Sequence, residues 1–280
     1  MNTQKFRIMA VIDPTRVDQW ALKKALSIAR NREGSKMVAY LSVHSDAKCD
    51  DAERLRTVEV TRHKMWLEQI LTGFVDEGVA IDAIVEWNAD WRRAVSEVAE
   101  HGQFDLVVKQ ASGRPDSLTN SDRQLIRSLP DSALLLVRHD PRDELKKVLV
   151  AVDFNATDAS HTALNEAIMD LGKRIRGEDG KIELHSISAY PESDKFVHPT
   201  DVAKVLGITR SQAHVRQGSA AEVIPDMANR IGADLVVVGS VGRRGLSGIT
   251  VGNTAEKILM DIDADVLVIV REQKRQRNAA

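Results

Sequence analysis

Short apolar segments and longer amphipathic segments alternate along the whole 280-residue chain. The apolar segments carry hydrophobic residues at consecutive positions, as in 235–238 (LVVV), rather than at every second position. Such runs are typical of strands that are buried on both faces of a parallel sheet. Between them, Leu22, Leu26 and Ala29 recur at helical spacing and predict a helix with one buried face. The pattern therefore predicts an α/β fold in which helices cover both faces of a parallel sheet.

The alternation occurs twice along the chain. Residues 7–13 (RIMAVID) are similar to residues 147–153 (KVLVAVD), and each is a short apolar strand that ends in aspartate. A helix is predicted after each strand, over 18–30 and over 159–173. Three later pairs of predicted strands also match, namely 37–43 with 182–187, 104–108 with 233–238, and 133–137 with 265–270. Two similar α/β units in tandem therefore account for the chain.

The boundary between the units is expected near Asp143, where a proline and several charges interrupt the pattern in the sequence HDPRDEL. This division gives a first domain of residues 1–142 and a second of residues 143–280, each of an ordinary size for one domain. The segments 45–60 and 191–207 are the least patterned. We expect them to cross the surface around short helices.

The sequence LVVVGSVGRRGLSGITVGNT at 235–254 indicates a ligand site. Its apolar strand is expected to end at Gly239, Gly242 follows, and Gly252 stands directly before a predicted helix. Glycines let the backbone approach a ligand closely, and the start of a helix offers unpaired N–H groups to a phosphate. The layout therefore predicts a backbone cradle for phosphate.

The two repeats differ at this point. When residues 109–112 are laid on residues 239–242, both glycines are absent from the first repeat, and its loop before the final helix is shorter by three residues. All four tryptophans lie in the first repeat, whereas 11 of the 16 glycines lie in the second. We therefore expect side chains to fill the first repeat and the second to keep an open cradle.

These features resemble the universal stress protein family. The spacing of Gly239, Gly242 and Gly252, the aspartate Asp153 after a first strand, and the segment 218–220 (GSA) are similar to the nucleotide-binding signature of that family. The resemblance covers essentially the whole chain and extends to the tandem, two-domain members. It implies a five-stranded parallel sheet in each unit, with strand order 3-2-1-4-5, and a pseudo-twofold axis between the units.

The resemblance also implies an adenine nucleotide at the carboxyl ends of the strands in the second unit. ATP is the expected ligand, ADP and AMP are alternatives, and the resemblance leaves open whether Mg²⁺ accompanies the nucleotide. Asp153 would contact the adenosine portion, and the residues implied to line the adenine slot are Ile187, Val238 and Gly239. The residues implied to hold phosphate are Gly242, Gly252, Asn253 and Thr254. Family members that bind ATP usually carry serine or threonine where Asn253 stands, so this position is where binding is expected to be weakest.

The cradle lacks an accompanying catalytic arrangement. Residues 239–254 include neither a Walker-type lysine nor a nucleophile elbow nor paired carboxylates. The sequence therefore favours a stress-response regulatory protein that binds ATP without rapid hydrolysis. Two alternatives stay open: a weak ATPase, and a scaffold or interaction protein whose pocket takes no nucleotide or takes another small molecule or a lipid. Asp153 also has a structural alternative, because an aspartate at a strand end can cap a turn and Asp13 stands in the other repeat.

The composition indicates which cellular compartment and which kinds of partner are expected. A net charge of -2 argues against the broad basic surface that nucleic-acid binding needs. The single cysteine, Cys49, excludes an internal disulfide and favours a reducing compartment. The histidines lack the spacing of metal ligands, and no apolar run approaches the roughly 18 residues of a membrane span. We therefore expect a cytoplasmic protein without a metal site or membrane span, whose chains can pair as a homodimer.

Overall fold

A computed structural model describes residues 6–32, 34–46, 50–74, 78–112, 120–129, 132–141, 145–177, 180–245, 248–250 and 253–272. The chain forms two compact units. The first unit comprises residues 1–110 and 132–141, and the second comprises residues 111–131 and 142–280. Helix α4 (Asn120–Ser128) therefore packs within the second unit, although its sequence lies inside the first repeat. The expected division into domains near Asp143 stays a prediction.

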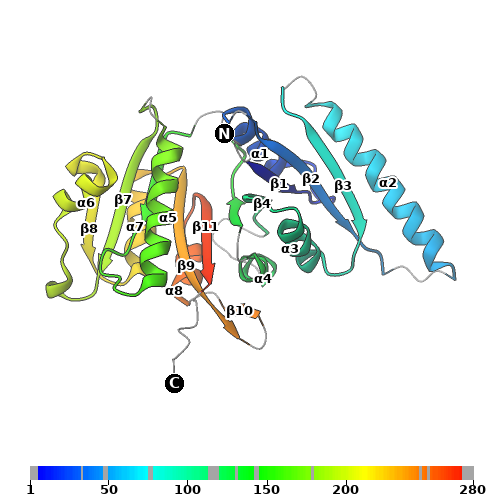
Figure 1. Ribbon diagram of the computed structural model, residues 1–280. Coiled ribbons are helices and arrows are strands. Elements are labelled where there is room, and N and C mark those ends of the chain that lie inside the picture. The colour runs from blue at the N-terminus through cyan, green and yellow to red at the C-terminus, as the bar shows by residue number, and fades with distance from the viewer. Residues whose placement is uncertain are drawn as a thin grey trace. The chain divides into compact units, whose positions relative to one another are not determined.

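Five parallel strands form the sheet of the first unit, in the order β3-β2-β1-β4-β5. Figure 1 labels the first four of these strands along the chain, β1 to β4. The strands are β1 (Arg7–Val11), β2 (Lys36–Val43), β3 (Ile81–Trp87), β4 (Leu106–Gln110) and β5 (Ala133–Val137). The helices of this unit are α1 (Trp20–Arg30), α2 (Ala52–Thr72) and α3 (Trp91–His101). The predicted strand order 3-2-1-4-5 is confirmed.

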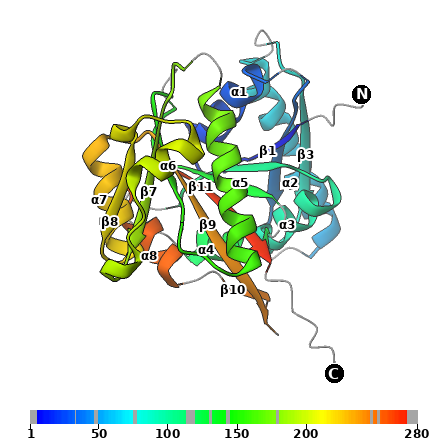
Figure 2. The ribbon, with the colours of Figure 1, turned by 60° about the vertical axis from the view of Figure 1, so that its left-hand side comes forward.

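The second unit has the same order, β8-β7-β6-β9-β11, and these strands are also parallel. They are β6 (Lys147–Ala151), β7 (Glu183–Tyr190), β8 (Ala213–Gln217), β9 (Leu235–Gly245) and β11 (Asp265–Glu272). The connecting helices are α5 (Ala159–Arg176), α6 (Pro199–Leu206), α7 (Ala220–Ile231) and α8 (Asn253–Asp261), seen from a second side in Figure 2. Because such crossovers are right-handed, α5 and α6 lie on one face of the sheet and α7 and α8 on the other.

Burial explains the consecutive apolar positions. Ile8, Met9 and Ala10 of β1 are fully buried, because helices cover both faces of the strand. Leu22 and Leu26 form part of the buried face of α1, as the helical spacing predicts.

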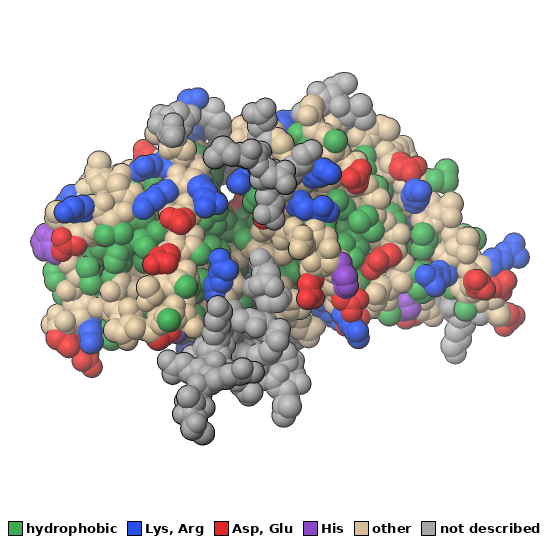
Figure 3. Space-filling view, viewed as in Figure 1, with side chains coloured by type: hydrophobic (Ala, Val, Ile, Leu, Met, Phe, Trp, Pro, Cys, Tyr) green, Lys and Arg blue, Asp and Glu red, His purple; other side chains and the backbone are tan. Residues whose placement is uncertain are grey.

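Basic and acidic side chains are interspersed over the described surface shown in Figure 3, in keeping with the near-zero net charge. Among the described residues, no helix is long and apolar enough to cross a membrane.

The elements that the hydrophobic pattern does not reveal lie at the edges of the sheets. Strand β3 is only partly covered and mixes apolar with acidic residues, and β8 is short and mostly polar. The expectation of short helices around 45–60 is wrong, because α2 is a single helix of 21 residues. Only Leu67 of α2 is buried, so no apolar stripe marks the helix in the sequence. The start of α2 is fixed instead by Asp51, whose side chain accepts a hydrogen bond from the backbone N–H of Arg54 at 2.8 Å.

Strand β9 continues to Gly245 and does not end at Gly239. Residues 235–242 pair with residues 265–272 of β11, and β10 (Gly248–Thr250) then pairs with β9 in an antiparallel hairpin. The expectation of a loop directly after Gly239 is therefore wrong, because the long partner strand β11 supplies backbone hydrogen bonds there. The helix predicted after Gly252 is confirmed, since α8 begins at the next residue.

Two equivalent carboxylates fix the alignment of the repeats. Asp105 Oδ2 accepts a hydrogen bond from the backbone N–H of Arg7 at 2.8 Å, and Asp234 Oδ2 accepts one from that of Lys147 at 2.8 Å. Each aspartate stands just before the fourth strand of its unit and bonds to the start of the first strand. The repeats therefore align with Asp105 opposite Asp234.

This alignment corrects the comparison of the repeats by one residue. Gln110, and not Lys109, occupies the position of Gly239, so glycine is absent from this position of the first repeat. The same count sets Gly113 opposite Gly242 in the sequence, but Gly113 lies outside the described residues, and the expectation for this second glycine is not tested. The first loop is shorter by four residues, because 114–119 stand where the second repeat has 243–252.

Gly239 lies where α5 packs closely on β9. A Cβ atom at this position would stand 2.6 Å from Ile168 Cδ1 and 2.7 Å from Leu164 Cγ and Cδ2. Contacts this short require the neighbouring side chains to move, so a side chain at this position would disturb the packing of α5 on β9.

We predict that Gly239→Ala lowers the free energy of unfolding by about 1–3 kcal/mol, because the added methyl overpacks the contact with α5. Urea unfolding followed by circular dichroism measures the change. Leu164→Ala provides the control, since it removes one of the colliding side chains. The double variant is expected to be more stable than the sum of the single effects predicts, and simple additivity would contradict this account of Gly239.

Candidate functional site

The candidate site lies at the carboxyl ends of the central strands. In each unit the first strand lies between the second and the fourth, so β1 lies between β2 and β4, and β6 lies between β7 and β9. The connections that leave the first and fourth strands run in opposite directions and open a crevice between these strands, which is where ligands of open α/β sheets bind. Asp13 and Asp153 each stand two residues beyond the end of the first strand, at this crevice.

Asp153 begins a tight turn in the second unit. Its Oδ1 accepts a hydrogen bond from the backbone N–H of Asn155 at 2.9 Å. The side-chain amide of Asn165, in α5, brackets the Asp153 backbone by donating to its carbonyl at 2.6 Å and accepting from its N–H at 3.1 Å. Asp153 therefore has a structural role in the turn. Its side chain is exposed, however, and within the described part of the chain its Oδ2 makes no hydrogen bond.

The structure places the other implied residues on the neighbouring elements. Ile187 in β7 is fully buried, and its carbonyl accepts a hydrogen bond from the Val152 N–H at 3.0 Å. Val238 in β9 is buried, and Gly239 beside it is partly exposed. The residues implied to hold phosphate lie further along the same edge. Gly242 is within β9, Asn253 and Thr254 begin α8, and Gly252 and the side chains of Asn253 and Thr254 lie outside the described residues.

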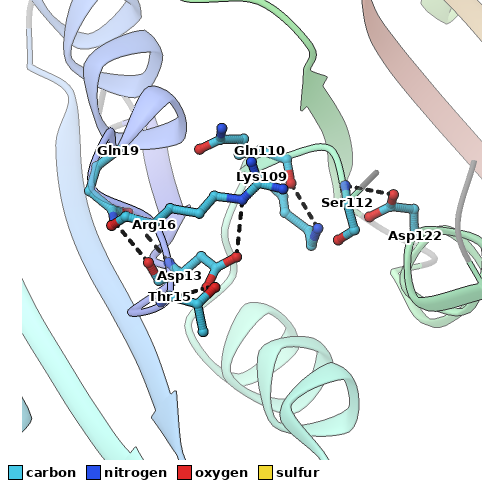
Figure 4. Close-up of polar contacts among 8 residues, drawn as sticks. All are labelled: Asp13, Thr15, Arg16, Gln19, Lys109, Gln110, Ser112 and Asp122. Carbon is cyan, nitrogen blue, oxygen red and sulfur yellow. Dashed lines mark hydrogen bonds and ion pairs between the residues drawn. The ribbon is translucent and has the colours of Figure 1, made fainter. Parts of the chain in front are cut away.

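In the first unit the equivalent aspartate is fully engaged (Figure 4). Asp13 Oδ1 accepts hydrogen bonds from the Thr15 backbone N–H at 3.0 Å and from its hydroxyl at 2.6 Å. Asp13 Oδ2 accepts from Arg16 Nε at 3.3 Å. Burial alone would raise the pKa of the Asp13 carboxyl, but the hydrogen bonds from Thr15 and the charge of Arg16 outweigh it and hold this pKa below its usual range.

Two glutamines close the rest of this edge. Gln19 is buried and donates from Nε2 to the carbonyls of Asp13 and Arg16, both at 2.8 Å. Gln110, with its amide oriented to suit its neighbours, donates to the Asp18 carbonyl and accepts from Arg16 Nη1, both at 3.1 Å. Figure 4 shows Arg16 extending toward Gln110, across the end of β4. Gln110, the residue of the first unit that is equivalent to Gly239, therefore contributes a side chain to a closed polar network.

Lys109 is also turned inward at the end of β4. Its ammonium group donates to the Gln110 carbonyl at 2.8 Å and lies 5.4 Å from the centre of the Trp91 ring. A buried ammonium needs such partners. The carboxyl edge of the first unit is thus occupied by its own side chains.

Sequence reasoning misses several of the residues that shape these edges. Gln19 and Asn165 hold equivalent aspartates from different helical positions, so no shared spacing marks them. Asp122 is fully buried in α4 and accepts a hydrogen bond from the Ser112 N–H at 3.0 Å, as Figure 4 shows. The only sequence signal for Asp122 is an acidic residue in a first helical turn.

A histidine pair lies on the sheet of the second unit, away from Asp153. His185 Nδ1 and His214 Nε2 are 3.2 Å apart, and the two rings are stacked with centroids 5.4 Å apart. Burial, together with the nearby His185, Arg216 and Arg210, lowers the pKa of His214 to about 4. His214 is therefore neutral at physiological pH and shares one hydrogen bond with His185.

The sequence and the fold are both similar to those of known proteins. Residues 144–270 match the sequence model of the "Universal stress protein family". The chain is 30% identical to universal stress protein E of Escherichia coli (strain K12), covering 95% of this chain and 94% of that protein. It is 26% identical to the universal stress protein E homolog of Haemophilus influenzae, with 96% and 99% covered. The chain therefore belongs to the universal stress protein family, which acts in the stress response.

Solved structures agree with the tandem fold. A functionally unknown protein from Pseudomonas aeruginosa PAO1 has a TM-score of 0.78 and 27% identity, with 95% of this chain and 92% of that chain covered. A universal stress protein from Archaeoglobus fulgidus DSM 4304 has a TM-score of 0.68 at 15% identity, covering 95% and 98%. The similarity to the second protein shows the shared fold alone. The expected resemblance to this family is confirmed.

We predict that Asp13→Asn lowers the free energy of unfolding by about 1 kcal/mol near neutral pH, because a partly exposed carboxylate loses its charged partners. The pKa of Asp13 is lowered in the fold, so its contribution is present above the unfolded pKa of about 3.9 and is lost as the pH falls through the folded pKa. Urea unfolding at about pH 7 and about pH 3 should show the difference between variant and wild type shrinking in acid. A difference that stays constant would contradict this role.

A second prediction concerns His214. Between its ordinary pKa of 6.5 and its folded pKa of about 4, only the unfolded chain binds the proton, so stability falls as the pH falls through this window. After allowance for solvent screening the loss is on the order of 1 kcal/mol. Thermal unfolding between about pH 7 and pH 4 should be less pH-dependent in His214→Gln than in wild type. Parallel curves for the two proteins would show that His214 does not cause the loss.

Proposed function

We propose that the second unit binds one adenine nucleotide, with ATP as the expected ligand, at the carboxyl ends of β6, β7 and β9. We also propose that the protein acts as a nucleotide-dependent regulator in the stress response. The contrast between the two aspartates carries this proposal. At the same point of the fold, Asp13 Oδ2 is paired with Arg16, whereas Asp153 Oδ2 makes no hydrogen bond to the described residues and is exposed.

The polar groups that this edge offers suit a nucleotide. A carboxylate accepts hydrogen bonds from ribose hydroxyls, and the N–H groups that begin α8 directly after Gly252 favour an anion. Strands β7 and β9 flank β6, and adjacent strands lie about 4.8 Å apart, so the three strand ends at this edge span about 10 Å. This length fits a ligand with an anionic group at one end and a neutral ring at the other.

The first unit explains the expected stoichiometry. Its equivalent edge is occupied by Arg16, Gln19, Lys109 and Gln110, which hydrogen-bond to one another's backbone and side chains or to Asp13. A nucleotide at that edge would have to displace these bonds. The proposal therefore assigns one nucleotide to each chain, with Mg²⁺ entering only together with it.

The proposed regulatory role also concerns how the nucleotide acts and where in the cell the protein works. Residues 239–254 offer no Walker-type lysine to support fast hydrolysis, so the nucleotide would act by its presence rather than its turnover. With its single cysteine, the protein would work in the cytoplasm, as a monomer or a homodimer.

Isothermal titration calorimetry with ATP, ADP and AMP tests the proposal. Wild type is expected to bind one ATP, and Asp153→Asn to weaken binding by about 10-fold, because one charged hydrogen-bond acceptor for the ribose is lost. The matched control is Asp13→Asn, which makes the same change at the equivalent point of the first unit and should leave ATP affinity unchanged. Absence of ATP binding by wild type, or equal losses in both variants, would overturn the proposal.

A further inference from the structure

An aromatic cluster closes the end of β7 in the second unit. Tyr190 is the last residue of this strand. Phe196 meets the Tyr190 ring edge to face, with centroids 5.5 Å apart at 77°, and meets the His198 ring at 6.3 Å and 86°. These are preferred geometries for aromatic pairs. We refer to Tyr190, Phe196 and His198 as the aromatic cluster.

The Tyr190 backbone and the His198 ring are each held by a hydrogen bond. The Tyr190 carbonyl accepts a hydrogen bond from the Gly218 N–H at 3.0 Å, which fixes the end of the strand. His198 is the N-cap of α6, and its Nδ1 accepts from the Thr200 N–H at 3.3 Å. Phe196 therefore contacts the rings of two residues, and 48% of its surface is exposed. These contacts restrict the Phe196 ring before any ligand binds, which lowers the entropy cost of stacking on it.

The register of the sheet brings the cluster to the proposed nucleotide site. Ala151 at the end of β6 pairs with Ile187, and the Val152 N–H still bonds to the Ile187 carbonyl. Counting on from this pairing, Asp153 stands level with the residue before Tyr190. Parallel strands are about 4.8 Å apart, so the end of β7, from which the cluster extends, lies next to the turn of Asp153, on the side of β6 opposite β9.

We infer that Phe196 stacks against the purine base of the nucleotide bound by the second unit and selects for a planar aromatic ring. This inference rests on the proposed nucleotide binding. It orients the ligand, with the base at β7, the ribose at Asp153 and the phosphates toward β9 and α8. A base covering the exposed side of Phe196 removes apolar surface from water and adds aromatic contact.

The test compares affinities for ATP and for inorganic tripolyphosphate, measured by calorimetry. Phe196→Ala is expected to weaken ATP binding by about 5- to 100-fold, the usual range for loss of one stacked ring, and to leave tripolyphosphate binding unchanged. Phe196→Trp should retain ATP binding, and its added tryptophan fluorescence should change on ATP addition by more than that of wild type. Val205→Ala is the matched control, because Val205 lies in the same unit and is also 48% exposed; it should bind ATP as wild type does.

The outcomes separate the two proposals. If wild type binds ATP and Phe196→Ala binds it equally well, the stacking role is overturned and nucleotide binding stands. An equal loss of ATP and tripolyphosphate affinity in Phe196→Ala would also overturn the stacking role, since it would indicate general damage to the site. If wild type binds no ATP, the proposed function fails and the stacking role fails with it.

Discussion

The close contact between α5 and β9 at Gly239 is the constraint on which the second unit depends. Leu164 and Ile168 occupy the space that any side chain at Gly239 would need. Because the helix can lie this low on the sheet, Asn165 in the same turn of α5 reaches the backbone of Asp153 and holds its turn. One missing side chain in a strand thus helps to position a polar group at the edge of the sheet, and packing and site geometry cannot be separated here.

The two units satisfy the same backbone requirement in different ways. Each has an aspartate after its first strand whose Oδ1 accepts the N–H two residues on, and each has a side-chain amide that brackets this aspartate. In the first unit a further arginine, glutamine and lysine complete the network and leave the carboxylate occupied. In the second unit that outer layer is missing among the described residues. A duplicated fold can therefore keep its architecture in both copies while a single copy offers exposed polar groups to a ligand.

The fold follows closely from the sequence, and the details of the site do not. Central strands are buried on both faces, so every position is apolar and the run is visible without a structure. Edge strand β3 and helix α2 contact the rest of the unit on a narrow face, so their sequences show no clear period. The similarity of the two repeat sequences alone places Lys109 against Gly239. The hydrogen bonds of Asp105 and Asp234 in the structure show that Gln110 stands there.

The sequence by itself determined the tandem α/β organisation, the strand order implied by the family resemblance, and the helix start after Gly252. These features depend on local periodicity and on residue types that have few conformational alternatives. Tertiary structure alone decided that β9 runs on to Gly245, that Gly239 serves helix packing, and that Arg16 closes the edge of the first unit. Each of these depends on a partner distant in the chain or on the direction of one long side chain. Short-range patterns carry neither kind of information.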